Sequence, residues 1–125
     1  MENNIKGFKD LKVWQKAHQL GLDIIELVDG LPEKLIYHSI GNQLLRSATS
    51  IASNIAEGYG SFSRKEYRRY LGIALKSAYE TENWLKLLAE SKVFQRIITK
   101  EKIDNLEKVN IEIIKMLISL MNKLK

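Results

Sequence analysis

The 125-residue chain contains no cysteine, one proline and seven glycines. Without cysteine it forms neither a disulfide nor a thiolate metal site. The scarcity of proline and glycine disfavours a turn-rich β fold and favours long, uninterrupted helices. The two histidines, His18 and His38, are twenty positions apart and cannot form a metal site by themselves. We therefore expect no metal and no cofactor.

Long hydrophobic runs are also missing. No apolar stretch approaches the length that crosses a bilayer, and the first twelve residues lack the hydrophobic region of a signal peptide. Together with the absence of cysteine, these features predict a cytoplasmic protein that does not enter a membrane. The net charge of +5 permits an anionic partner but does not require one.

Four segments carry hydrophobic residues at spacings of three and four, the pattern of amphipathic helices. They run from about Asp10 to Asp29, from Ser39 to Glu57, from Ser63 to Glu90 and from Thr99 to the C-terminus. Gly30 is expected to end the first helix in the left-handed conformation, just before Pro32. Ser63 and Glu66 have the spacing of a capping box.

Four helices joined by short connections predict an all-α fold, an antiparallel up-down four-helix bundle. A chain of 125 residues is most economically one domain with one modest core. We therefore predict a single domain over residues 1–125, with residues 1–8 flexible.

The second predicted helix contains RSATSIASNIAEG, residues 46–58, and has an unusual polar side. Its apolar residues cover about 160° of the helical wheel, and the opposite side carries one positive and one negative charge. Because an exposed helix face gains from lysine and glutamate, this composition predicts a covered face. An internal hydrogen-bond network, a subunit contact, a ligand surface and an ordinary solvated face all remain open. One polar row follows this side: Arg46, Ser50, Asn54 and Glu57.

The start of the third predicted helix is strongly basic. The stretch SFSRKEYRRYLGIALK, residues 61–76, contributes +4 of the total charge of +5. The helix dipole disfavours cations in the first turns, so stability alone does not explain them. Cations beside the free N–H groups of a helix start favour phosphate binding; the alternative is a solvated face whose arginines pair with neighbouring acids. The predicted nucleic-acid-binding residues are Arg64, Lys65, Arg68, Arg69 and Lys76.

The last predicted helix has more apolar surface than a bundle needs. Its apolar residues span about 220° of the wheel, whereas a core-facing stripe needs little more than 100°. A helix lying on a membrane would have a polar face richer in lysine and arginine. We therefore predict that the chain is a homo-oligomer.

No catalytic motif is recognisable. The sequence has no glycine-rich phosphate loop, no serine elbow and no metal cluster. We predict that the protein is not an enzyme and has no catalytic residues. The catalytic alternative requires Glu57 to lie in a buried polar cavity.

Two blocks carry a resemblance to a known family: FKDLKVWQKAHQL, residues 8–20, and QLLRSATSIASNIAEGYGSFSRKEYRRYLGIALKSAYETENWL, residues 43–85. They resemble the four-helix bundle proteins encoded within intervening sequences of bacterial 23S ribosomal RNA genes. The resemblance covers about residues 8–92 and implies an up-down bundle that assembles into a homopentameric ring, with no known catalysis. A relative of the same fold, the accessory variability protein of diversity-generating retroelements, binds nucleic acid and a reverse transcriptase through a basic pentameric surface.

Two functions follow as expectations. The first is a non-enzymatic, homo-oligomeric bundle whose basic surface contacts RNA or DNA backbone without sequence specificity. The second is a protein-interaction scaffold, for example an accessory subunit for a reverse transcriptase or another polymerase. Phosphate contacts make binding strongly salt-dependent, whereas an apolar protein contact responds little to salt.

Overall fold

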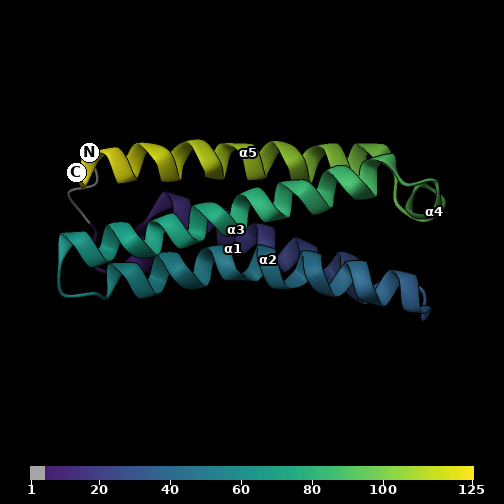
Figure 1. Cartoon of the computed structure of the whole chain (residues 1–125), viewed down its shortest axis with the longest axis horizontal. Coiled ribbons are helices and arrows are strands. Elements are labelled where there is room, and N and C mark those ends of the chain that lie inside the picture. The colour runs from purple at the N-terminus through teal and green to yellow at the C-terminus, as the bar shows by residue number, and fades with distance from the viewer. Residues whose placement is uncertain (1–4) are drawn as a thin grey trace.

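The computed structural model describes residues 5–125 and is a bundle of four long helices that run alternately up and down (Figure 1). Within these residues there is no strand, and the predicted all-α bundle is confirmed. None of the helices in this part of the chain is long and apolar enough to cross a membrane. The elements are η1 (Phe8–Asp10), α1 (Lys12–Asp29), α2 (Leu35–Tyr59), α3 (Arg64–Glu90), α4 (Lys92–Gln95) and α5 (Lys100–Lys123).

The start of α2 differs from the prediction. The helix begins at Leu35, one turn before the expected Ser39. The extra turn is held by tertiary packing, because the ring of Tyr37 lies edge-on to Phe94 with ring centroids 5.2 Å apart. Phe94 belongs to the four-residue helix α4, which periodicity over a longer window does not detect. Local propensity at the start of α2 is therefore overridden by a contact 57 positions away in the chain.

The two predicted helix caps have different outcomes. Gly30 is right-handed, with φ −83° and ψ −2°, so the expected left-handed cap is wrong. Its N–H donates to Glu26 O at 3.2 Å, so a continued helical turn satisfies the last carbonyls of α1 without positive φ. Ser63 does cap α3, since its Oγ accepts from the Glu66 N–H at 3.0 Å. The Glu66 carboxylate, however, accepts a hydrogen bond from Arg69.

Helices α2 and α3 pack closely where they meet at the end of α2. A Cβ placed on Gly58 would lie 2.7 Å from Tyr70 Cβ and 3.1 Å from Tyr67 Cδ1. Only glycine fits at that separation, which explains why the block ends in glycine rather than another small residue.

The alternating topology brings the starts of α1 and α3 to the same end of the bundle as the ends of α2 and α5, on the left in Figure 1. At this end Ile5 and Phe8 pack against the core, and the Phe8 ring lies edge-on to Trp14. Residues 1–4 of the segment expected to be flexible lie outside the described residues. The flexibility of residues 1–8 therefore stays a prediction.

Candidate nucleic-acid interface

Three of the five residues predicted to bind nucleic acid have exposed side chains that can contact phosphate. Arg64, Lys65 and Lys76 are exposed on α3, and none forms an ion pair within residues 5–125. Arg64 and Lys65 occupy the first two positions of the helix, where the backbone N–H groups have no intrahelical partner. The start of α3 is therefore exposed, with two cations beside its free N–H groups, which is the arrangement that a phosphate contact requires.

The other two predicted residues, Arg68 and Arg69, have partners within the fold. Arg68 is half-buried and donates from Nε to Met121 O at 3.2 Å, in the last turn of α5, where a cation is favoured by the helix dipole. Arg69 donates to the Glu66 carboxylate, and its guanidinium lies 4.6 Å from the centre of the Tyr70 ring. The hydrogen bond from Arg69 lowers the pKa of Glu66. Arg68 thus ties α3 to α5, and the charge of Arg69 is partly neutralised.

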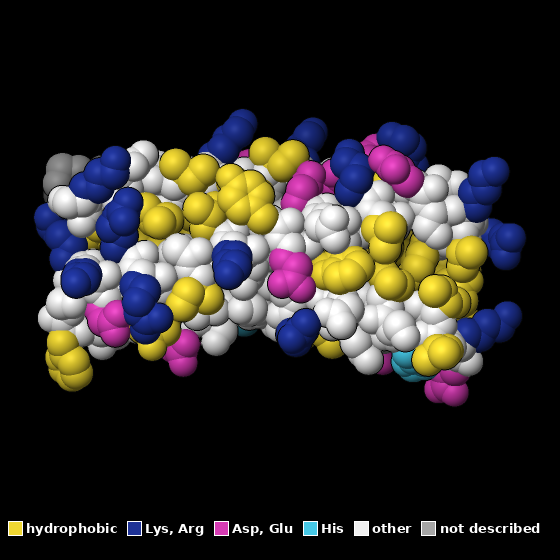
Figure 2. Space-filling model, viewed as in Figure 1, with side chains coloured by type: hydrophobic (Ala, Val, Ile, Leu, Met, Phe, Trp, Pro, Cys, Tyr) yellow, Lys and Arg dark blue, Asp and Glu magenta, His cyan; other side chains and the backbone are white. Residues whose placement is uncertain are grey.

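The same end of the bundle holds cations that the sequence reasoning missed. Lys12 at the start of α1 and Lys123 at the end of α5 line one hollow of about 730 Å³. In Figure 2 lysine and arginine side chains gather over this end, where α3 begins and α5 ends. We call Lys12, Arg64, Lys65 and Lys123 the basic end. In an up-down bundle the first helix begins where the last one ends, and that rule would have found the two lysines.

The residues of the predicted polar row on α2 have different surroundings in the structure. Ser50 and Asn54 are half-buried toward α3: Ser77 Oγ donates to Ser50 Oγ at 3.0 Å, and Asn54 Nδ2 donates to Ser50 Oγ at 2.9 Å. Arg46 is exposed and bonds to Gln43 of its own helix. Two members of the row therefore belong to an internal hydrogen-bond network.

Glu57, the last member of the row, is exposed at the end of α2. The catalytic alternative required this carboxylate to be buried in a polar cavity, and that condition is not met. Its position gives no support to an acid–base role.

A second hydrogen bond between α2 and α3 lies deeper. Thr81 Oγ1 donates to Ser47 Oγ at 2.9 Å, and both side chains are buried. Part of the uncharged side of α2 is thus covered by α3, as its composition predicted. The remainder, which includes Asn42, Thr49 and Ser53, is exposed.

Two carboxylates meet between α3 and α5. Burial raises the pKa of Glu82, and the neighbouring carboxylate of Glu107 raises it further; Asn110 and Lys86 act in the opposite direction. Lys86 Nζ lies 3.5 Å from Glu107. The buried atoms Glu82 Oε1 and Asn110 Oδ1 have no hydrogen-bond partner among the described residues. A proton on Glu82 would turn one of these acceptor groups into a donor. Sequence reasoning missed the pair because its members lie on different helices.

Glu82→Gln is therefore expected to stabilise the fold at neutral pH, by about 1 kcal/mol, the lower range for a buried polar group without a partner. A raised folded-state pKa means that the carboxyl stabilises the fold in acid and loses this contribution as pH rises through that pKa. The extra stability of Glu82→Gln over wild type should consequently vanish below the pKa that the carboxyl has in the unfolded state. Urea unfolding of both proteins between pH 4 and pH 8, near the ordinary range of glutamate, measures the difference.

Glu112→Gln supplies the contrast for that experiment. A hydrogen bond from Lys16, whose Nζ lies 2.8 Å from the carboxylate, lowers the pKa of Glu112. Its contribution is therefore present at neutral pH and lost as pH falls through the folded-state pKa. Glu112→Gln should lower the free energy of unfolding at neutral pH and have no effect on it in acid. If both variants show the same pH trend, the assigned environment of Glu82 is wrong.

Comparison with known proteins gives the family. The sequence model of the 23S rRNA-intervening sequence proteins matches residues 9–119. The chain belongs to this family. A solved structure of a protein of unknown function, from the S23 ribosomal protein family of Bacteroides thetaiotaomicron, is 36% identical with a TM-score of 0.79. The similarity covers 87% of this chain and 97% of that one. No curated protein matches the chain. Membership of the 23S rRNA-intervening sequence proteins thus agrees with the bundle, and it assigns no activity.

Proposed function

We propose that this 23S rRNA-intervening sequence protein is a non-enzymatic, cytoplasmic homo-oligomer, pentameric by its resemblance, that contacts RNA or DNA backbone without sequence specificity. The observation that carries the proposal is the basic end, where exposed cations of α1, α3 and α5, unpaired within residues 5–125, come together. Such cations neutralise phosphates and release counterions whatever the base sequence.

Exposed aliphatic side chains support self-association. Ile111 and Ile118 on α5 are 40% and 39% exposed, and Ile73 on α3 is 36% exposed. Ile111 and Ile118 are the part of the apolar surplus predicted for the last helix that the bundle does not bury. An oligomer that covers them would also repeat the basic end several times, and repeated weak phosphate contacts add to the affinity for one nucleic acid.

The test removes cations that have no ion-pair partner in the described part of the chain. The variant Arg64→Ser/Lys65→Ser/Lys76→Ser is expected to bind a structured RNA at least tenfold more weakly in 50 mM salt. Its log–log salt slope should fall by about 0.7–0.9 for each phosphate that is no longer neutralised. Arg68 stays in place because it bonds to Met121 O. Fluorescence anisotropy measures affinity, and light scattering confirms an unchanged oligomer.

A matched control removes the same charge at the opposite end of the bundle. The exposed residues Lys92, Arg96 and Lys102 are changed to serine, and binding should stay within about twofold of wild type. Equal losses in the two variants would mean that net charge, not the basic end, attracts RNA. Wild-type binding by the first variant would mean that Arg64, Lys65 and Lys76 do not contact phosphate.

The alternative function, a protein-interaction scaffold, is favoured by a different observation. The hollow beside Lys12 has an aliphatic floor, which contributes nothing to phosphate contacts. An accessory subunit of a reverse transcriptase or another polymerase would use such a surface, with binding that responds little to salt.

A further inference from the structure

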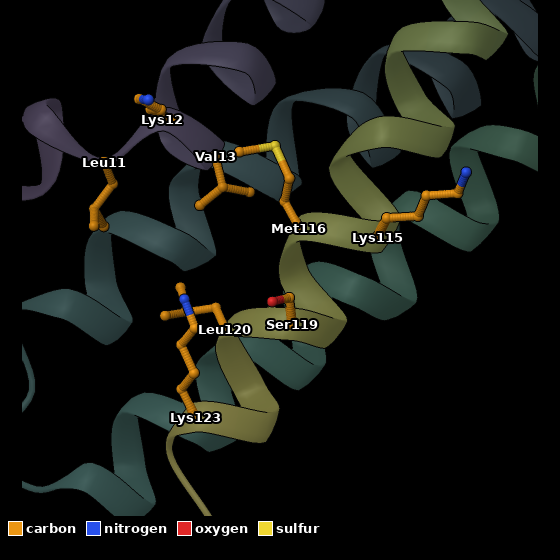
Figure 3. A pocket seen from close by; sticks show the side chains of 8 residues that line it. All are labelled: Leu11, Lys12, Val13, Lys115, Met116, Ser119, Leu120 and Lys123. Atoms are coloured by element: carbon orange, nitrogen blue, oxygen red, sulfur yellow. The ribbon is translucent and has the colours of Figure 1, made fainter. Parts of the chain in front are cut away.

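A hollow lies between α1 and α5 at the basic end. Its volume is about 730 Å³, and its floor is made by Leu11, Val13, Met116 and Leu120. In Figure 3 Met116 reaches across toward Val13, and Lys123 extends over Leu120. Leu11 and Val13 are buried, and Met116 and Leu120 are half-buried. The charged side chains that line the hollow are Lys12, Lys115 and Lys123, and no acidic residue of the described chain lines it.

A second hollow, of about 500 Å³, lies between the same two helices toward their other end. It is lined by Asp23, Glu26 and Glu101, with Lys102 as the cation among its described lining residues. Between the two hollows α1 and α5 are bridged by the Lys16–Glu112 ion pair. We call this seam, with its two hollows, the α1–α5 groove. Its charge changes from basic to acidic along its length.

We propose that the α1–α5 groove binds an amphipathic helix of a partner protein, with acidic residues in its first half and basic residues in its second. A hollow between two helices receives the ridge of a third helix, whose apolar side chains fill the floor. From Lys12 to Glu26 the groove is about 21 Å long at 1.5 Å per residue, so a helix of four to five turns spans it.

The charge order also sets the direction of the partner helix. Acids stabilise the start of a helix and bases its end, through the helix dipole. A helix that places its acids at Lys12 and Lys123 and its bases at Asp23 and Glu101 therefore runs parallel to α1 and antiparallel to α5.

Other ligand classes fit the groove less well. A nucleic acid laid along it would bring phosphates against Asp23, Glu26 and Glu101, and like charges repel. A fatty acid has one carboxylate and leaves the acidic half without a partner. The groove shares Lys12 and Lys123 with the basic end, but its apolar floor and its acidic half fit a helix rather than a phosphate backbone.

The test uses the full chain and two synthetic 18-residue peptides of identical composition, both stapled so that circular dichroism shows equal helicity. One peptide carries acids in its first half, bases in its second and a leucine stripe; the other has the same stripe with alternating charges. In fluorescence anisotropy the charge-ordered peptide is expected to bind at least tenfold more tightly. A photo-crosslinker at its N-terminus should label residues around Lys12 and Lys123 rather than around Glu101.

Two charge-reversed variants locate the site. Lys12→Glu/Lys123→Glu should weaken binding of the charge-ordered peptide at least tenfold. Lys65→Glu/Lys76→Glu makes the same charge change on α3 and should leave the affinity for this peptide within twofold of wild type. Equal affinity of the two peptides, or equal effects of the two variants, would overturn the proposal. If Lys12→Glu/Lys123→Glu changes the oligomer mass and neither peptide binds, a second copy occupies the groove, and the partner-protein proposal is wrong.

Discussion

Replacing Gly58 with alanine is expected to lower the free energy of unfolding by about 2 kcal/mol, within the range for an overpacked core. The added Cβ would stand 2.7 Å from Tyr70 Cβ and 3.3 Å from Tyr67 O. Neither atom is the far end of a flexible side chain, so the end of α2 must move away from the start of α3. Alanine is the better helix former by about 1 kcal/mol, and the loss is expected despite that gain.

Gly72→Ala is the matched control, because Gly72 lies inside α3. There the nearest atom to a new Cβ is Met121 Cε at 3.6 Å, an ordinary contact. Without overpacking only the helix propensity changes, and stability should rise by about 0.5–1 kcal/mol. Urea unfolding followed by circular dichroism measures both variants. A neutral Gly58→Ala would show that the two helices are packed less closely there than the structure indicates.

The four long helices are predictable from sequence because their signal is local. Apolar residues at spacings of three and four mark each buried stripe. The starts of α3 and α5 follow from the capping residues Ser63 and Thr99. The start of α2 is not local, since Tyr37 is fixed by Phe94 on another element. The conformation of Gly30 is not predictable from the sequence either, because a right-handed glycine ends a helix as well as a left-handed one does.

The candidate site is less predictable, because it depends on which side chains meet across helices. Arg64 and Arg68 are equivalent in the sequence, one turn apart in a basic stretch. Only the packed bundle shows that Arg68 bonds to the last turn of α5 while Arg64 stays exposed and without an ion pair in the described chain. Likewise Lys12 and Lys123 are at opposite ends of the chain yet line one hollow. Charge in a segment therefore predicts a basic surface, but it does not separate exposed cations from those that are bonded within the fold.

The polar contacts between helices also define which helices pair. Asn110 is completely buried in α5, and its Nδ2 donates to Ala78 O of α3 at 2.9 Å. Thr81, one turn along α3, bonds instead to Ser47 of α2. A buried polar group is costly in any arrangement that leaves it without a partner. These two contacts consequently favour the observed placement of α3 between α2 and α5 over alternatives with similar apolar burial.

Asn110→Asp is expected to lower the free energy of unfolding by about 3 kcal/mol at neutral pH, the scale for an uncompensated buried charge. The new side chain removes the donor to Ala78 O and places a carboxyl beside Glu82, whose pKa is already raised. Burial and the neighbouring acids would raise the pKa of the introduced carboxyl as well. The folded state then binds its proton more tightly than the unfolded state does, so the loss should grow as pH rises and shrink in acid.

Asn83→Asp makes the same change on the exposed side of α3 and should alter stability by no more than about 0.5 kcal/mol at any pH. Urea unfolding of both variants between pH 4 and pH 8, on either side of the ordinary carboxyl range, separates the contributions. Adding Glu82→Gln to Asn110→Asp should recover part of the loss at neutral pH, because it removes the nearest competing charge. A loss that is independent of pH and unaffected by Glu82→Gln would mean that the missing hydrogen bond to Ala78, rather than a buried acid cluster, determines the stability of the α3–α5 contact.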